Sequence, residues 1–142
     1  MPIINLEGVQ VESGERVLAT ITLPDFEPGH NLVMATVKGV VKKTPIEKFE
    51  RVRSTGIRAI TVADDDKLAW VAVSSGDDDI ILATAMGRIA RFKEQEVRPM
   101  GRDAAGVIGI RLANKSDKVV VMGVLREDMD ILVLTETGYG KR

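Results

Sequence analysis

The chain has 142 residues, 44% of them hydrophobic, so it is long enough to form a domain with its own core. It has no cysteine and a single histidine, His30, which excludes a disulfide framework, a thiolate metal site and a histidine-rich zinc site. Its 20 Lys and Arg nearly balance its 21 Asp and Glu, and it has neither a membrane-spanning apolar run of about 20 residues nor a basic segment ahead of an apolar one. We therefore expect a cytoplasmic protein that does not insert into a membrane.

The sequence repeats with a period of about fifty residues. Residues 32–43 align with residues 80–91, and a third copy begins at Ile131. The aligned threonines, Thr36, Thr84 and Thr135, are 48 and 51 positions apart. Three residues after each threonine stands a glycine, which we expect to adopt a positive φ in a tight hairpin. These glycines are Gly39, Gly87 and Gly138.

The second half of the unit also recurs. Residues 56–60 (Gly-Ile-Arg-Ala-Ile) align with residues 106–110 (Gly-Val-Ile-Gly-Ile), and each is followed by an acidic turn and an apolar strand. Three segments near the start of the chain, residues 2–6, 13–15 and 17–21, match this second half as well. The sequence thus predicts the second half of one unit in residues 1–30, complete units in residues 31–78 and 79–129, and the first hairpin of another in residues 130–142.

The sequence of each unit predicts β structure throughout. Short runs rich in Val, Ile and Thr alternate with Gly, Asp or Ser turns, which is typical of strands. The segments with helix-compatible spacing, residues 45–49 and 93–97, are one turn long. In the first complete unit the expected strands are residues 31–36, 40–44, 57–62 and 68–73. Four strands per unit predict an all-β, propeller-like fold, with two complete four-stranded blades and a half-blade at each end.

Charge follows the repeat. Residues 38–58 carry seven Lys and Arg against two Glu, and residues 86–111 carry six against three acidic residues. Residues 59–85, between them, hold six Asp and one Lys. Because equivalent positions of neighbouring blades lie on the same side of the array, the basic segments should form one band, which favours a polyanionic partner.

Three cations recur in register, because Lys43, Arg91 and Arg142 each lie four residues after the repeat glycine. Aromatic residues make up only 4% of the chain, so contact with a duplex backbone is favoured over stacking of unpaired bases. The structural alternative is that these cations keep a β protein soluble and protect its strand edges, but their register favours a binding band. The candidate DNA-binding residues are Lys42, Lys43, Arg51, Arg53, Arg88, Arg91, Lys93, Arg98, Arg102, Lys141 and Arg142.

Other polar and aromatic residues have structural interpretations. The Asp runs at residues 64–66 and 77–79 lack the spacing of a calcium loop and are expected to be solvated turns. Trp70 and Phe49 are expected in the core. Tyr139 has no motif beside it that would activate a nucleophile. We therefore expect no catalytic, cofactor-binding or metal-binding residues in this chain.

Five short sequence motifs closely resemble those of the C-terminal domain of the bacterial DNA gyrase A subunit. They occur in residues 34–45, 91–94, 97–102, 106–112 and 137–142, and include Lys42-Lys43-Thr44-Pro45 and Gly138-Tyr139-Gly140-Lys141-Arg142. The resemblance implies a β-pinwheel, a propeller-like fold in which blades exchange strands and duplex DNA wraps around a basic perimeter. The family's Gln-Arg-Arg-Gly-Gly-Lys-Gly signature is absent, and the family sequence would continue beyond Arg142.

The resemblance also implies a place in a larger enzyme. In the A subunit of a type II topoisomerase, the domain would support negative supercoiling driven by ATP. Its partners would be the N-terminal region of the same polypeptide and the gyrase B subunit. ATP and Mg²⁺ would act elsewhere in that enzyme. The alternatives are the A subunit of the paralogous decatenating topoisomerase and a propeller-type scaffold that binds an acidic protein. The incomplete units at both ends further predict self-association.

Overall fold

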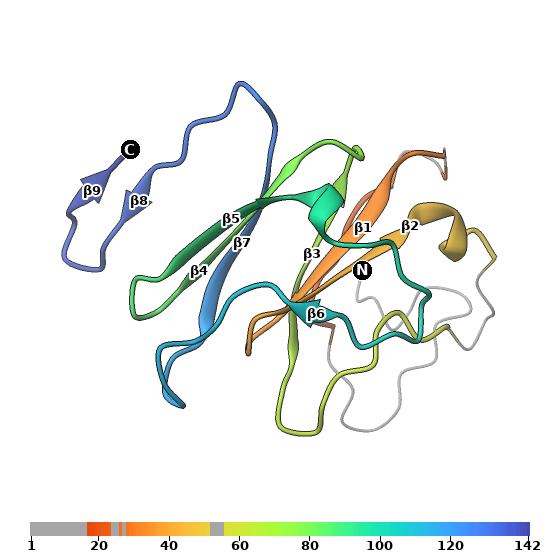
Figure 1. Cartoon of the computed structure of the whole chain (residues 1–142), viewed down its shortest axis with the longest axis horizontal. Helices are drawn as coiled ribbons and strands as arrows, with labels where there is room; N and C mark the ends of the chain where they lie inside the picture. Colours follow the sequence, from red (N-terminus) through yellow and green to blue (C-terminus); the bar gives the residue numbers. More distant parts are fainter. Residues whose placement is uncertain (1–16, 24–25, 27, 52–55) are drawn as a thin grey trace, which may run out of the picture.

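The computed structural model describes residues 17–23, 26, 28–51 and 56–142, and these form an all-β structure without an α-helix (Figure 1). The described residues include two short 3-10 turns, η2 (Ile46–Phe49) and η3 (Glu94–Glu96). The strands are β1 (Asn31–Thr36), β2 (Val40–Pro45), β3 (Leu68–Ser74), β4 (Asp79–Thr84), β5 (Ile89–Lys93), β6 (Val107–Ile108), β7 (Val119–Leu125), β8 (Val133–Leu134) and β9 (Gly140–Lys141). Most of the expected half-unit in residues 1–30, including its segments 2–6 and 13–15, lies outside the described residues.

The repeat is visible in the strand pairing. β1 lies antiparallel between β2 and β3, and β4 lies antiparallel between β5 and β7. The registers correspond, since Asn31 pairs with Pro45 in the first unit and Asp79 pairs with Lys93 in the second. Both units also have a register shift directly before the repeat threonine, at Thr36 and Thr84.

The hairpin turn after the repeat threonine is the same in all three copies. The threonine hydroxyl oxygen accepts a hydrogen bond from the backbone N–H four residues later, at 3.1 Å in Thr36, 3.2 Å in Thr84 and 3.1 Å in Thr135. Gly39, Gly87 and Gly138 have φ angles of 88°, 79° and 87°. The expectation of a positive φ at these glycines is therefore confirmed.

The sheets differ from the expected blades. β3, β1 and β2 gain a fourth strand, β6, from the following unit, whereas β4, β5 and β7 form a three-stranded sheet and β8 and β9 a two-stranded one. Residues 57–62 form no strand; the Thr61 N–H instead donates to the Ala104 carbonyl at 3.3 Å. The glycine before β6 permits the exchange, because a Cβ on Gly106 would lie 2.6 Å from the Val41 carbonyl oxygen.

The core lies on both faces of β1, because alternate side chains of a strand point to opposite sides. On one face Val33 packs with Ile80 and Leu82 of β4, and on the other Leu32 and Met34 pack with η2. As expected, Phe49 is buried and Trp70 packs against the first cluster; Val97 is buried in that cluster as well. Because β1 is covered on both faces, all six of its residues are buried.

Candidate functional site

Two of the candidate cations, Lys42 and Lys43, are buried. Their residues are 0% and 5% exposed, because loops cover β2 on both of its faces. The Lys42 Nζ donates to the carbonyls of Ala59, at 2.5 Å, and Arg102, and burial lowers the pKa of Lys42 while the charge of Asp103 opposes this shift. The Lys43 Nζ donates to the Glu94 carbonyl at 2.7 Å. The expectation that both lie on an exposed basic band is therefore wrong for this structure.

A second group of cations is paired within its own hairpin. Asp79, at the start of β4, accepts a hydrogen bond from the Arg91 Nε at 2.6 Å, and its other oxygen lies 2.9 Å from the Lys93 Nζ. These contacts hold the pKa of Asp79 below its ordinary value, with the bond from Lys93 contributing most. The same pair recurs one unit later, where the Arg142 guanidinium lies 3.4 Å from Asp130. The in-register cations thus have a structural role that the sequence pattern alone did not indicate.

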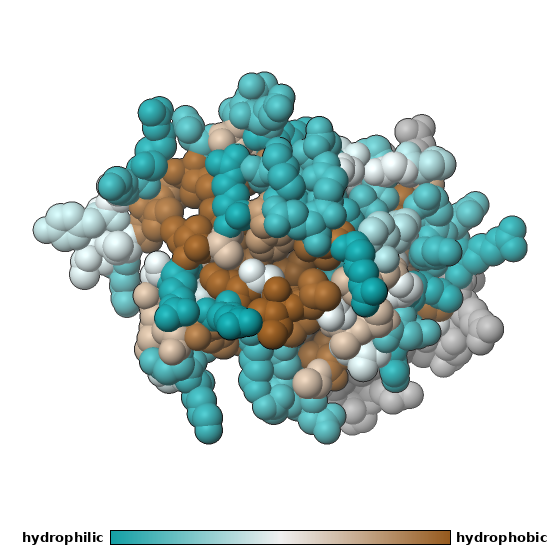
Figure 2. Space-filling view, viewed as in Figure 1, coloured by the Kyte–Doolittle hydropathy of each residue, from teal (hydrophilic) through white to brown (hydrophobic). Residues whose placement is uncertain are grey.

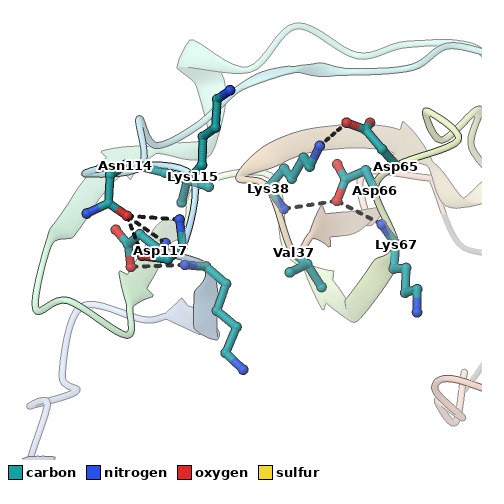
Figure 3. Close-up of a pocket in the computed structure, with 11 residues that line it drawn as sticks. Val37, Lys38, Asp65, Asp66, Lys67, Asn114, Lys115 and Asp117 are labelled. Carbon is teal, nitrogen blue, oxygen red and sulfur yellow. Dashed lines mark hydrogen bonds and ion pairs between the residues drawn. The ribbon is translucent and has the colours of Figure 1, made fainter.

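In each of two acidic turns, one carboxylate accepts hydrogen bonds from backbone N–H groups and so stabilises the neighbouring hairpin (Figure 3). The Asp66 carboxylate accepts hydrogen bonds from the backbone N–H groups of Lys38 and Lys67, and Asp117 accepts the equivalent bonds from Met86 and Lys118. The expectation of solvated turns is confirmed for Asp64 and Asp65, which are exposed, but is wrong for Asp78 and Asp79 of the second run, which are only 5% and 7% exposed. In the sequence these carboxylates resemble surface charge, because a sequence pattern does not show which backbone amides they cap.

An open groove of about 950 Å³ lies between these two turns, with Val37 and Leu112 among its lining residues. Lys67 and Lys118, which stand in register 51 positions apart, line it together with Lys115. Lys38, at its rim, is ion-paired with Asp65. Lys67, Lys115 and Lys118 were not among the candidates from the sequence, because they lie in segments whose overall charge is negative.

The remaining candidates reach solvent at two ends of the sheets. Arg51 and Arg98 each lie two residues after a 3-10 turn, and both are exposed. Arg102, which is half-buried, lies on the same connection as Arg98, and this connection runs beside the end of β2, because Pro99 forms a bridge with Lys43 and the Met100 N–H donates to the Lys43 carbonyl. Within the described part of the chain, none of the three arginines forms an ion pair.

The other exposed candidates lie at the hairpins. Arg88 follows the turn glycine Gly87, and its Nη1 donates to the Arg111 carbonyl at 3.2 Å. Lys141 lies in β9, away from the connection that carries Arg98. Arg53 falls outside the described residues. The structure therefore separates the candidates into buried lysines, Asp-paired cations, hairpin cations and a loop group that comprises Arg51, Arg98 and Arg102.

Comparison with known proteins identifies the family. The family model described as DNA gyrase C-terminal domain, beta-propeller, matches residues 30–75 and 78–126. Over 141 residues, the chain is 46% identical to the DNA gyrase A subunit of Salmonella typhimurium and 45% identical to that of Escherichia coli K12. Each alignment covers 99% of this chain but only 16% of the relative, so the chain spans about a sixth of these proteins.

Solved structures support the same fold. A DNA gyrase A C-terminal domain superimposes with a TM-score of 0.80 at 23% identity, covering 93% of this chain and 43% of the other. The C-terminal domain of a DNA topoisomerase IV superimposes with a TM-score of 0.79 at 30% identity, covering 92% of this chain and 41% of the other. The propeller-like fold expected from the sequence motifs is therefore confirmed.

Proposed function

Because the chain belongs to the family of DNA gyrase C-terminal domains, we propose that it binds duplex DNA without sequence preference and contributes to a DNA wrap. The observation that carries the proposal is the loop group, which comprises Arg51, Arg98 and Arg102. Arg51 and Arg98 each lie two residues after the 3-10 turn of successive units, one position out of strand register, so similar exposed cations recur along the array where a curved phosphate backbone could contact them. Arginines at such positions contact phosphates and do not read base edges.

The proposed contact surface is narrower than the eleven candidates of the sequence. Lys42 and Lys43 are excluded because their ammonium groups bond to backbone carbonyls inside the protein. Arg91, Lys93 and Arg142 are secondary, since a phosphate would compete with Asp79 or Asp130 for each of them. Arg88 and Lys141 would contribute where the DNA passes the hairpins. Arg53 remains in the proposal because it lies close in sequence to Arg51.

In the full-length protein, we propose that this region supports ATP-dependent negative supercoiling by a type II topoisomerase in the bacterial cytoplasm. The N-terminal region of the same polypeptide, together with the gyrase B subunit, would supply strand passage, with ATP and Mg²⁺ bound there. The expected division into units at residues 31–78 and 79–129 also remains part of the proposal. Each unit would then be completed by a strand of the next, as β6 completes the first sheet.

The proposal is tested by measuring binding to two duplexes of unrelated sequence over a range of salt concentrations. The double variant Arg98→Ala/Arg102→Ala should weaken binding to both duplexes alike and reduce the slope of log affinity against log salt by about two units, roughly one for each lost phosphate contact. The matched control is Lys67→Ala/Lys118→Ala, which removes the same charge at the hairpin end. Equal losses in the two double variants would show that net charge alone matters and would contradict the proposed surface.

Two other functions are alternatives to the proposal, and related experiments separate the scaffold from it. A domain of the decatenating paralogue would share the salt-dependent binding, and the solved topoisomerase IV domain shows that this paralogue has the same fold. Closure of nicked circular DNA by ligase tests the wrap itself, because a protein that wraps DNA with a fixed hand shifts the linking number. A protein-binding scaffold would show neither salt-dependent DNA binding nor a linking-number shift.

A further inference from the structure

The ammonium group of Lys42 lies between two connections that both carry exposed cations. The first connection comprises residues 56–67, which lead into β3, and the second comprises residues 97–106, between η3 and β6. The second connection runs across the front of the molecule in Figure 1, and hydrophilic side chains reach the surface along it in Figure 2. The Lys42 Nζ donates to the carbonyl of Ala59 in the first connection and to that of Arg102 in the second. One buried side chain thus joins two segments that are far apart in the sequence.

The two connections pack against different parts of the core. Ile60 of the first packs against the cluster that contains Met34. Val97 of the second belongs to the cluster that contains Val33, and these two clusters lie on opposite faces of β1. Each connection is therefore anchored separately, and its anchoring does not set its distance from the other.

Polar contacts fix the spacing of the two connections. Besides the bonds from Lys42, the Thr61 N–H donates to the Ala104 carbonyl at 3.3 Å, and the Thr61 Oγ1 donates to the Asp103 carbonyl at 2.7 Å. Next to them a cavity of about 230 Å³, rather than apolar packing, separates residues 62–63 from residues 105–106. Thr61 is exposed, so water competes for its bonds, whereas Lys42 is 0% exposed. The charged and buried donor is the stronger of the two links.

The second unit shows that the sheet does not need this lysine. Lys42 pairs with Met34 across β1 and β2, and the equivalent pair in β4 and β5 is Ala90 with Leu82. The strands have the same register with an alanine, which buries no charge and carries no cost of desolvating an ammonium group. The lysine is therefore explained by the two carbonyls that its ammonium group joins, and not by the pairing of β2.

We propose that Lys42 is a positioning residue for the DNA contact, which holds Arg58 of the first connection and Arg102 of the second at a fixed spacing. The inference rests on the proposed DNA binding by the loop group, to which it adds Arg58, an exposed residue directly before Ala59. Lys42 itself does not touch phosphate. Because the two connections are already joined in the free protein, less conformational entropy is lost when their arginines are ordered on DNA.

The first measurement needs no DNA. The chain has no cysteine, so Thr61→Cys/Ala104→Cys introduces a unique pair of thiols, one on each connection, where a backbone hydrogen bond already brings the chains together. The equilibrium of this pair with oxidised and reduced glutathione gives the effective concentration of the two thiols. Lys42→Met should lower this concentration by about tenfold, because two bonds from a charged donor are lost. The matched control is Ala83→Cys/Ile89→Cys, an opposed pair in β4 and β5, which Lys42→Met should leave unchanged.

The second measurement is binding to duplex DNA over a range of salt concentrations. Lys42→Met should weaken binding by about tenfold with the salt slope unchanged, since the phosphate contacts remain but must be ordered on binding. In this variant, oxidation of the Thr61→Cys/Ala104→Cys pair should restore the affinity of the unmodified chain, and reduction should remove the gain. The control Lys43→Met removes the neighbouring buried lysine, which donates to neither connection's joined carbonyl, and should leave the affinity unchanged.

Circular dichroism confirms that each variant is folded, and the disulfide keeps Lys42→Met folded if the reduced variant is not. An effective concentration that Lys42→Met leaves unchanged would overturn the proposal, and so would a lowered one with unaltered DNA affinity. A loss of affinity that the disulfide does not restore would also overturn it, because Lys42 would then act in another way than by joining the connections. A salt slope that Arg98→Ala/Arg102→Ala leaves unchanged would instead overturn the proposed function, and with it the DNA role of Lys42, whatever the effective concentration is.

Discussion

Replacing Lys43 tests whether this lysine stabilises the protein interior or binds DNA. Lys43 is 5% exposed, and its Nζ donates to the Glu94 carbonyl at 2.7 Å, so it links the two units of the repeat. Lys43→Ala removes a buried methylene stem, which contributes about 2 kcal/mol at roughly 0.8 kcal/mol per methylene. It also removes a hydrogen bond from a charged donor, which contributes about 1.5–3 kcal/mol. Part of this loss is offset, because the variant no longer has to desolvate a buried ammonium group.

The net loss expected for Lys43→Ala is about 3 kcal/mol of unfolding free energy, or a Tm lower by about 10 °C. Lys43→Met keeps most of the stem and should lose only about 1 kcal/mol. The exposed control Arg98→Ala should stay within about 0.5 kcal/mol of the unmodified chain. Urea unfolding followed by circular dichroism measures all three.

DNA binding by Lys43→Met, measured where the variant remains folded, should be unchanged in affinity and in salt slope. The reasoning would be refuted by the reverse pattern, with unaltered stability and a salt slope reduced by about one unit. In that case Lys43 would contact phosphates, and its register with Arg91 and Arg142 would mark a binding position after all.

The remaining predictions concern the hairpin turns. Gly39→Ala should destabilise the chain by about 2 kcal/mol or more, because its φ is 88° and the new Cβ would lie 2.6 Å from the Ile110 carbonyl oxygen. Its matched control, Gly87→Ala, has a φ of 79° and no atom within 4 Å of the new Cβ, so urea unfolding should show a loss of only about 1 kcal/mol; equal losses would contradict the close approach. Burial alone would raise the pKa of Asp117, but hydrogen bonds from the backbone N–H groups of Ala113 and Met86 hold the pKa below its ordinary value. Its stabilising contribution should therefore be present above the pKa of the unfolded chain and be lost as the pH falls through the lower pKa of the folded state. Asp117→Asn should flatten the loss of stability in acid, and an unchanged acid profile would exclude this role.

The parts of the fold that local patterns specify could be predicted from the sequence. The hairpins were predictable because a threonine and a glycine at fixed spacing determine both the turn bond and the positive φ. The all-β class followed from short Val- and Ile-rich runs. The partner of β2 was not predictable from the pattern, because β6 lies more than sixty residues further along the chain and its two residues alone carry no signal of which edge they pair with.

The candidate site was harder to predict, since burial decides which charges are available. Lys42 and Lys43 occur in a strand that alternation would leave half-exposed, but loops cover both of its faces. The aspartates of the turns look like surface charge until Asp66 and Asp117 are seen to accept backbone N–H bonds. Arg51 and Arg98 were candidates from the sequence because they belong to the basic segments of the repeat, and the structure leaves both exposed.

The most direct test of the central claim is to map the DNA contact on the chain by amide chemical shifts. Titration of the isotopically labelled chain with a short duplex should shift amides of residues 97–103 and 47–51, and the shifts should disappear when salt releases the DNA. Residues 37–39, 65–67 and 115–118, at the hairpin end, should change little. Shifts concentrated at that hairpin end, with none around Arg98 and Arg102, would contradict the account.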